Sequence, residues 1–208
     1  MIRSVTGWWQ TSSERMAGLV MAVSALATAW SGYQASLWSG KQAAQYNLST
    51  QYRTDAARAN DDAARQRMLD IMFFAKWLEA HAEHRSRVTS IYELHFMPEF
   101  RPAFDTWRQS ADTAGQLTPF QLSQYHVQRA DDAARLDSAA NRALRAGDAA
   151  SESGDGYVFV TVILANVLFF AGAIRPLVST RTRGGVIALA IVLCVAGLVR
   201  LVLLPVAR

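Results

Sequence analysis

The sequence has a single cysteine, five prolines, and neither glycine nor proline between Lys41 and Met97. One cysteine, Cys194, excludes a disulfide within the chain. The stretch without glycine or proline is dominated by strong helix formers such as Ala, Arg, Gln, Leu and Met. It therefore predicts one very long helix that runs out from residue 41 to the neighbourhood of Pro98.

Motifs of common catalytic sites are also missing. The chain has no His-Glu-x-x-His pair, no phosphate-binding glycine loop and no Gly-x-Ser-x-Gly elbow. No nucleophile or general base can be named, so we expect a protein that is not an enzyme and needs no cofactor.

Three long apolar stretches are present, and they bracket a polar middle. They run from Met16 to Trp38, from Tyr157 to Ile174 and from Val186 to Leu204. Each approaches or exceeds the length that a helix rising 1.5 Å per residue needs to cross a hydrocarbon core of ~30 Å. The pattern predicts an all-α membrane protein with three transmembrane helices. Ala27-Thr28-Ala29 also fits a signal-peptide cleavage site, but the apolar character continues past it to Trp38, which favours a retained span.

The net charge of +4 does not indicate a nucleic-acid partner. Residues 40–156 contain 14 Lys/Arg and 16 Asp/Glu, a balance of −2, so the positive excess lies beside the apolar stretches. Short basic flanks favour the cytoplasmic side. We expect a bacterial inner-membrane protein with a cytoplasmic amino terminus and an external polar middle, from the positions of Arg3, Arg15, Arg175, Arg181 and Arg183.

A five-residue repeat gives the polar middle a predicted shape. Asp-Asp-Ala-Ala-Arg occurs at 61–65 and at 131–135, symmetrically about Pro98. A chain that leaves the bilayer near Gly40, turns at Pro98 and returns near Gly156 would bring the two copies to one level in an antiparallel hairpin. Positions whose numbers sum to about 196 are then level, which pairs Asp61 with Arg135 and Arg65 with Asp131. An Ala-rich charged helix also produces such repeats by chance, and this alternative stays open.

Coiled-coil spacing accompanies the repeat. Tyr52, Ala56, Ala59 and Ala63 follow a 4-3-4 rhythm, which is typical of a helix seam. We call the two predicted arms of the hairpin, residues 40–67 and 121–150, the stalk. Alanines bury little apolar area, so we expect the stalk to need further partners.

Aromatic residues collect beyond the stalk. They include Phe73, Phe74 and Trp77, and they predict a head of three helices around an aromatic core. Thr118-Pro119-Phe120-Gln121 has the form of a capping box and predicts the start of the return helix, while Gly115 predicts the end of a short helix at Ala114. The predicted segments are a tail (1–11), span one (12–39), outgoing stalk (40–67), head (68–120), return stalk (121–150), linker (151–156), span two (157–174), basic loop (175–185), and span three with a short tail (186–208).

A few polar residues are candidate sites. His81 and His84 share a helix face near Glu79 and Glu83, but they are weak metal candidates because solvated histidines are far more common than ligands. Asn166 lies inside span two and is expected to hydrogen bond to another helix. Arg200 lies near the end of span three and is expected to reach the surface or to meet Asp155 and Glu152, which are expected nearby.

A resemblance is carried by Trp30-Ser-Gly-Tyr-Gln-Ala-Ser-Leu-Trp-Ser-Gly-Lys-Gln42 and by the Ala/Gln/Arg-rich segment behind it. The chain resembles uncharacterised bacterial three-span membrane proteins with one amino-terminal span, a helical middle and two carboxy-terminal spans. The resemblance implies an inner-membrane setting and no particular activity.

Three function classes are compatible with these observations. The first is a scaffold or accessory subunit that uses its hairpin to form a homo-oligomer or to dock on a larger membrane complex. The second is a channel or transporter subunit in which Asn166 and Arg200 face a pore made by several copies. The third is a sensor subunit that signals through a partner, because only short loops are predicted on the inner side.

Overall fold

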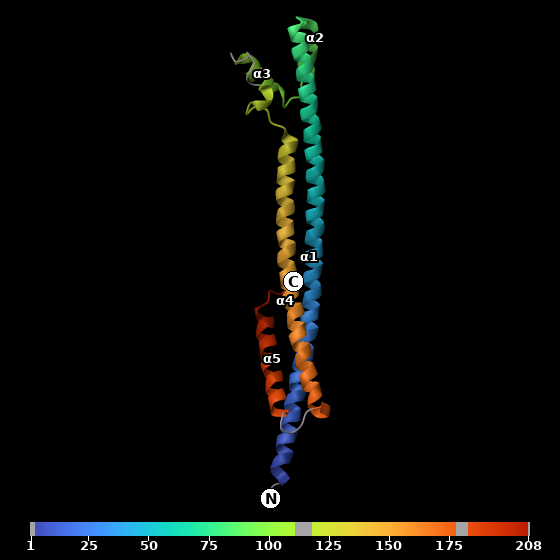
Figure 1. Ribbon diagram of the computed structural model, residues 1–208, viewed down its shortest axis with the longest axis vertical. Helices are drawn as coiled ribbons and strands as arrows, with labels where there is room; N and C mark the ends of the chain where they lie inside the picture. Colours follow the sequence, from blue (N-terminus) through green and yellow to red (C-terminus); the bar gives the residue numbers. More distant parts are fainter. Residues whose placement is uncertain (1–2, 111–117, 178–182, 208) are drawn as a thin grey trace. The chain divides into compact units, whose positions relative to one another are not determined.

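The computed structural model describes the backbone of residues 3–110, 118–177 and 183–207, and the side chains of these residues except 3–14, 173–177 and 183. Every regular element in these ranges is helical (Figure 1). The predicted all-α class is therefore confirmed for the described residues. The elements are α1 (Arg3–Ala82), α2 (Ser86–His95), α3 (Arg101–Gln109), the 3-10 helix η1 (Pro119–Gln121), α4 (Gln128–Leu177) and α5 (Arg183–Leu203).

Three of these helices are long and apolar enough to cross a membrane. Their qualifying segments lie toward the amino terminus of α1, within α4, and in α5. By length and composition, the chain thus has the three candidate spans expected of a multi-pass membrane protein.

Helix α1 starts earlier and ends earlier than predicted. It already includes Thr11, so the predicted boundary between the tail (1–11) and span one (12–39) is wrong: the backbone on both sides of this boundary is helical. It ends at Ala82 and does not reach Met97.

The end of α1 is a Schellman motif without glycine. His84 adopts a φ of 56°, in the left-handed region, and its amide bonds to the carbonyl of His81 at 3.0 Å. The next amide, of Arg85, bonds to the carbonyl of Ala80 at 2.9 Å. This pair of bonds stops a helix, and the motif usually has glycine where His84 stands.

Helix α4 contains the predicted linker. It runs unbroken from Gln128 to Leu177, so residues 151–156, with Gly154 and Gly156, are helical. The contacts within the chain divide it into two compact units, and the boundary between the units falls inside α1 and inside α4. We call them the span unit (Met1–Asn47 and Ala143–Arg208) and the head unit (Leu48–Arg142).

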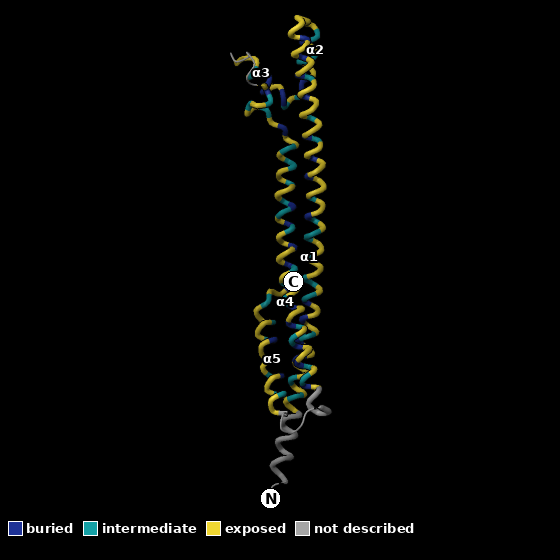
Figure 2. Tube along the Cα trace, in the orientation of Figure 1, coloured by how far each residue is buried: buried dark blue, intermediate teal, exposed yellow. Residues whose placement is uncertain are grey.

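In the span unit, α1, α4 and α5 share two apolar clusters. One cluster centres on Ala27, Val160 and Leu164. Leu198 and Leu201 of α5, and Leu204 just after it, pack against this cluster. The other centres on Val167, Ala190 and Cys194. Buried and exposed positions alternate along these helices (Figure 2). The buried positions of α1 between Ser24 and Gln34, and those of α4 between Tyr157 and Ala171, are three or four residues apart.

The level of α1 against α4 in the span unit differs from the predicted one. A Cβ on Gly147 would lie against the ring of Tyr46, and one on Gly154 would lie against Trp38. The predicted register put Tyr46 level with Ala150 and Trp38 level with Val158. The two helices are shifted by about one turn, because packing of the two rings onto glycines decides the level more strongly than symmetry about Pro98 does.

In the head unit, three helical segments and η1 surround an aromatic core. Thr118 and Gln121 form the predicted capping box, with the Thr118 amide donating to Gln121 Oε1 at 3.0 Å. This box opens only the single turn η1, and the return helix starts seven residues later than predicted, at Gln128. Helix α3 ends at Gln109, and the predicted helix end at Ala114 and Gly115 lies outside the described residues.

Candidate functional site

The aromatic core of the head unit fixes the positions of its polar groups. Phe74 and Trp77 project from α1 and are buried, whereas Phe73 is half-buried and packs against the cluster. Phe74 meets Trp107 and Phe120 edge-on at centroid distances of 5.3 and 5.6 Å. Edge-to-face contacts of this kind stabilise beyond the area that they bury. The core holds α1, α3 and η1 together, and it includes Phe96, Phe100 and Phe104.

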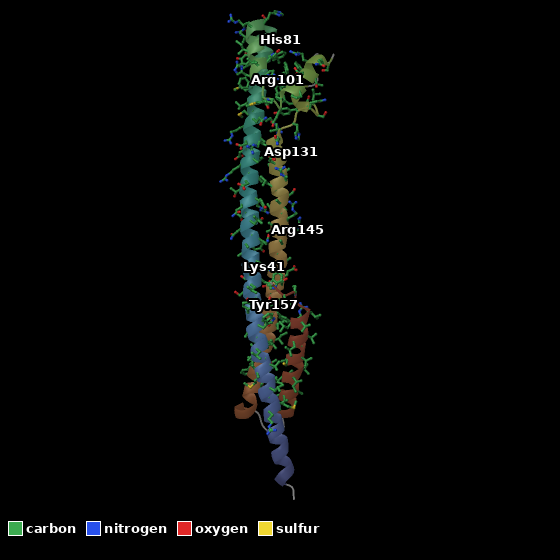
Figure 3. All side chains as sticks on the ribbon, turned by 180° about the vertical axis from the view of Figure 1, so that it is seen from behind. Lys41, His81, Arg101, Asp131, Arg145 and Tyr157 are labelled. Atoms are coloured by element: carbon green, nitrogen blue, oxygen red, sulfur yellow. The ribbon has the colours of Figure 1, made fainter. Side chains whose placement is uncertain are left out.

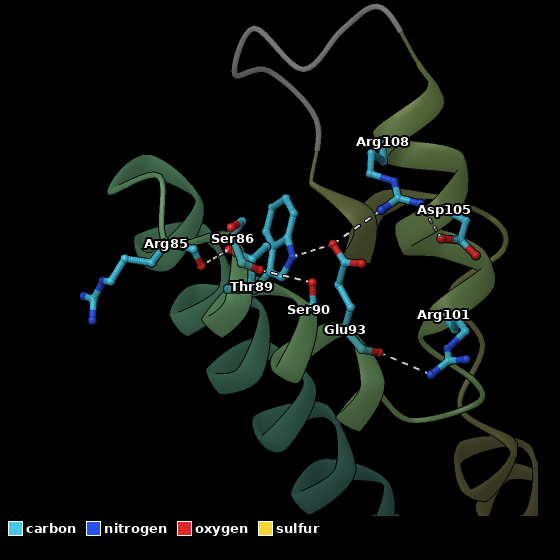
Figure 4. Close-up of polar contacts among 9 residues, drawn as sticks. Arg85, Ser86, Thr89, Ser90, Glu93, Arg101, Asp105 and Arg108 are labelled. Carbon is cyan, nitrogen blue, oxygen red and sulfur yellow. Dashed lines mark hydrogen bonds and ion pairs between the residues drawn. The ribbon is translucent and has the colours of Figure 1, made fainter.

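A cleft of about 330 Å³ lies between α2 and α3 at the edge of this core. Glu93 on α2 accepts hydrogen bonds at one carboxylate oxygen from Trp77 Nε1 at 2.9 Å and from Arg108 at 3.3 Å (Figure 4). Arg108 also pairs with Asp105 at 3.6 Å. The cleft is lined by Ser90, Glu93, Leu94, Phe96, Arg101, Phe104 and Asp105.

The guanidinium of Arg101 hydrogen bonds to the carboxy-terminal end of α2. It donates to the carbonyls of Glu93 and Leu94 at 3.2 and 3.4 Å. These carbonyls belong to the last turn of the helix, where cations are favourable. The charges of the cleft thus neutralise one another and hold α2 to α3.

His81 and His84 are not part of a set of metal ligands in the part of the chain that the structure describes. His81 stacks on Trp77 at 4.8 Å, near the end of α1 where Figure 3 marks it, and shares a shallow cleft with His84. The nearby carboxylates are engaged elsewhere, Glu79 with Lys76 at 2.8 Å and Glu83 with Arg85. Among the described residues no group of three or more His, Cys, Asp or Glu is placed to hold a metal ion.

Among the residues that the structure describes, the predicted pairs between the two repeats are not seen. Arg65 pairs with Asp62 in its own helix, and Arg135 pairs with Asp132 at 2.7 Å in its own. Asp131, marked near the start of α4 in Figure 3, pairs with His126, while Asp61 is exposed. A partner three residues away in the same helix is always within reach, so it replaces the predicted pair between α1 and α4.

One buried acid was missed by the sequence analysis. Asp70 on α1 is only 1% exposed and accepts a hydrogen bond from the Tyr125 hydroxyl at 3.0 Å. One turn earlier on the same helix, Gln66 donates to the Glu99 carboxylate. Burial raises the pKa of Asp70, the Tyr125 hydrogen bond lowers it, and the Glu99 charge raises it, with a net upward shift. We call Gln66, Asp70, Glu99 and Tyr125 the acid site.

The sequence did contain a signal for Asp70. Ala56, Ala63, Asp70 and Trp77 are each seven residues apart, and all four are buried. Extending the alanine rhythm by one heptad would have placed an ionisable residue on the seam, where such residues are costly and therefore informative.

The polar residues singled out in the predicted spans make no contact between helices in the described residues. Asn166 is exposed and donates to the carbonyl of Val162 in its own helix at 2.8 Å. Arg200 is exposed, and the described residues show no ion pair between it and Asp155 or Glu152. The expected bond between helices and the expected tether are therefore not seen within one described chain.

Other polar groups connect the helices of the span unit. The amide of Ala207 donates to Gln34 Oε1 at 2.8 Å, and the carbonyl of Pro205 accepts from Trp38 Nε1 at 3.0 Å and from the Tyr157 hydroxyl at 3.2 Å. These bonds hold the segment after α5 against α1 and α4.

In the described head unit, the carboxylates of Glu93, Asp70 and Glu99 accept hydrogen bonds from other segments, and the aromatic side chains form a core. The chain matches no protein-family model, no curated protein and no solved structure, so the residues and their geometry carry the functional argument.

Proposed function

We propose that the chain is a non-enzymatic integral membrane scaffold or accessory subunit of the bacterial inner membrane. Its three spans anchor it, and α1 and α4 form a long antiparallel hairpin that is presented on the outer side. The hairpin associates with a second copy of the chain in the same bilayer. The observation that carries this proposal is an apolar helix face that one copy leaves uncovered.

This face lies on α1 in the head unit. Met68, Ile71 and Leu78 are 72%, 49% and 47% exposed, and Ala75 and Ala82 between and after them are exposed as well. Their spacing of 3-4-3-4 residues is that of a coiled-coil seam. We call these five residues the exposed seam.

The exposed seam lies next to the buried one on the same helix. Asp70, Phe74 and Trp77 face the interior of the head unit, and the exposed seam begins two positions before Asp70. A helix with two adjacent apolar seams is typical of a bundle in which each helix contacts two others. The described chain covers only the first seam, which supports a partner helix at the second.

The available burial is large enough to matter. Fully burying a Leu, Ile or Met side chain is worth about 1.5–3 kcal/mol relative to full exposure. Since the three large residues of the exposed seam retain roughly half or more of their exposure, each copy offers several kilocalories per mole toward association. Met72 and Leu69, which flank the seam, are also partly exposed.

A second face of α1, in the span unit, supports the same partner. Gly18, Ala22, Ala25, Ala29, Gly32 and Ser36 are small, exposed and spaced by four and three residues. A Cβ on Gly18 or Gly32 would meet nothing within 4 Å. Small residues let helices in a membrane approach closely, and copies inserted with one orientation run parallel, so like residues meet across a two-fold axis.

Size measurement of the protein in nanodiscs tests the proposal. The wild-type chain is expected to be oligomeric, and the double variant Ile71→Glu/Leu78→Glu is expected to be monomeric with unchanged helix content. The matched control is Ala134→Glu/Ser138→Glu, which adds the same charge at two exposed positions of α4. A monomeric wild type without a co-purifying protein, or equal dissociation by both double variants, contradicts the proposal.

Crosslinking tests the parallel arrangement independently. In a Cys194→Ser background, Met68→Cys is expected to form a disulfide with its own counterpart. A cysteine at Arg58, an exposed position on α1 outside the exposed seam, is the control and is expected to crosslink weakly. Equal crosslinking at both positions would show random collision.

A further inference from the structure

The acid site joins three segments that are distant in sequence. Asp70 and Gln66 belong to α1, Glu99 lies in the turn between α2 and α3, and Tyr125 lies in the loop between η1 and α4. Tyr125 bonds to Asp70 across 55 residues, and Gln66 bonds to Glu99 across 33. The site therefore fastens both connecting segments of the head unit to α1.

The acid is set deep in the packing. The Asp70 residue is 1% exposed, and Phe74, one turn further along α1, belongs to the aromatic core. Tyr125 also contacts this core, edge-on to Phe120 at 5.2 Å and to Phe100 at 5.9 Å. A movement of Tyr125 away from Asp70 would therefore also disturb the aromatic packing.

Few charged groups face Asp70. From α1, Arg67 is close enough to interact with the Tyr125 hydroxyl, but its guanidinium forms no ion pair with Asp70 in the described residues. From the turn after α2, Glu99 adds a like charge. From the loop before α4, Tyr125 contributes the hydrogen bond, while the neighbouring His126 pairs with Asp131. The ionised carboxylate thus has one hydroxyl partner and an acidic neighbour.

We propose that Asp70 is a proton-binding site, and that its protonation tightens the turn bearing Glu99 and the loop bearing Tyr125 against α1. A neutral carboxyl keeps the tyrosine hydrogen bond, because a carboxylic acid still accepts. It loses the repulsion toward Glu99 and the cost of burying a charge. The head unit is then a device that responds to acidification on the side of the membrane where it lies.

The direction of the response follows from linkage. The pKa of Asp70 in the folded protein is raised above the value of an exposed carboxyl, chiefly by burial. The folded head unit therefore binds its proton more tightly than the unfolded one does. The state in which the turn and the loop are held against α1 is most stable at a pH below the pKa of Asp70 in the unfolded chain. Its stability is lost as the pH rises from there through the pKa of Asp70 in the folded chain.

Hydrogen exchange of the full-length protein in detergent is the test. Peptides that cover 96–101 and 119–127 are compared from about pH 8 to about pH 4, with the intrinsic pH dependence of exchange removed. In the wild type, protection is expected to rise on acidification, by up to about tenfold for each pH unit between the unfolded and folded pKa values. Asp70→Asn is expected to show protection that is high and independent of pH.

Two further variants make the outcome specific. Asp61→Asn removes an exposed carboxylate from the same helix and is expected to keep the wild-type response. Glu99→Gln keeps Asp70 titratable and is expected to move the midpoint to lower pH, because the neighbouring negative charge is gone. This variant also tests the proposal if Asp70→Asn does not fold.

The proposal is overturned by a flat wild-type profile, by an Asp70→Asn protein that keeps the wild-type response, or by an unchanged midpoint in Glu99→Gln. Loss of the response in Asp61→Asn would also overturn it, since general surface charge would then be the cause. None of these outcomes depends on whether the exposed seam binds a second copy.

Discussion

The indole Nε1 of Trp38 donates a hydrogen bond to the main-chain oxygen of Pro205, 3.0 Å away and 167 residues later in the chain. The hydroxyl of Tyr157 donates to the same oxygen at 3.2 Å. One acceptor in the segment after α5 thus connects α1 and α4 within the span unit. The proline has no amide of its own to offer, so its carbonyl is the group through which this residue can be held.

Replacing Trp38 by Phe is expected to weaken this connection. The ring remains apolar, but the donor is lost, which costs about 0.5–1.5 kcal/mol for one hydrogen bond. Thermal unfolding in detergent, followed by circular dichroism, measures the loss. Trp30→Phe is the control, because the Trp30 side chain is exposed and shares no bond with Pro205, and it should leave the midpoint nearly unchanged.

Two glycines of the span unit are expected to respond in opposite directions to alanine. A Cβ on Gly147 would lie 2.4 Å from the ring of Tyr46, whose hydroxyl bonds to Asp148 at 2.8 Å. Gly147→Ala should therefore displace the ring and destabilise by about 1–3 kcal/mol. Gly40→Ala meets no atom within 4 Å and should stabilise by roughly 0.5–1 kcal/mol, since alanine is the better helix former.

Thermal unfolding of the two glycine variants side by side is the measurement. Both replacements raise helix propensity equally, so the difference between them reports the contact with Tyr46. Equal stabilisation by both would show that the ring moves aside at no cost.

The alanine seam of the head unit allows a similar comparison. Ala63 is 4% exposed, whereas Ala57 on the same helix is exposed. Ala63→Leu is expected to lower the free energy of unfolding by about 1–3 kcal/mol through overpacking. Ala57→Leu should change it by less than about 0.5 kcal/mol, as is usual for surface positions. If both variants unfold at the wild-type temperature, Ala63 does not lie in a packed seam.

The helical class, the three helices long and apolar enough to cross a membrane, and the aromatic head could be predicted from the sequence. Each of them depends on composition and period over many residues. The heptad of alanines likewise pointed to the buried face of α1. Such averages are insensitive to the conformation of any single residue.

Predictions that depended on one or two residues were less successful. The end of α1 depends on a left-handed histidine, which no pattern signals where glycine is usual. The arginines of the two repeats pair with aspartates in their own helices and not with each other's repeat. Asp70 was overlooked because a single acidic residue in a helix resembles a solvated one unless its heptad position is counted. Contacts such as that of Gln34 with Ala207 join residues 173 positions apart and have no local signature.

Replacing Tyr125 by Phe is expected to destabilise the head unit in a manner that depends on pH. The Tyr125 hydroxyl lowers the pKa of Asp70 by bonding to the ionised form, against the larger upward effect of burial. Without the hydroxyl, the pKa rises further, and the folded state holds its proton more tightly. The loss of stability should therefore be greatest at neutral pH, about 1.5–3 kcal/mol for a hydrogen bond to a charged group, and smaller in acid, where Asp70 is protonated. Unfolding at two pH values measures it, with Tyr92→Phe as the control: that ring packs on the same aromatic core but does not reach Asp70. A loss of equal size at both pH values would show that Tyr125 acts through packing alone and does not bond to the ionised carboxylate.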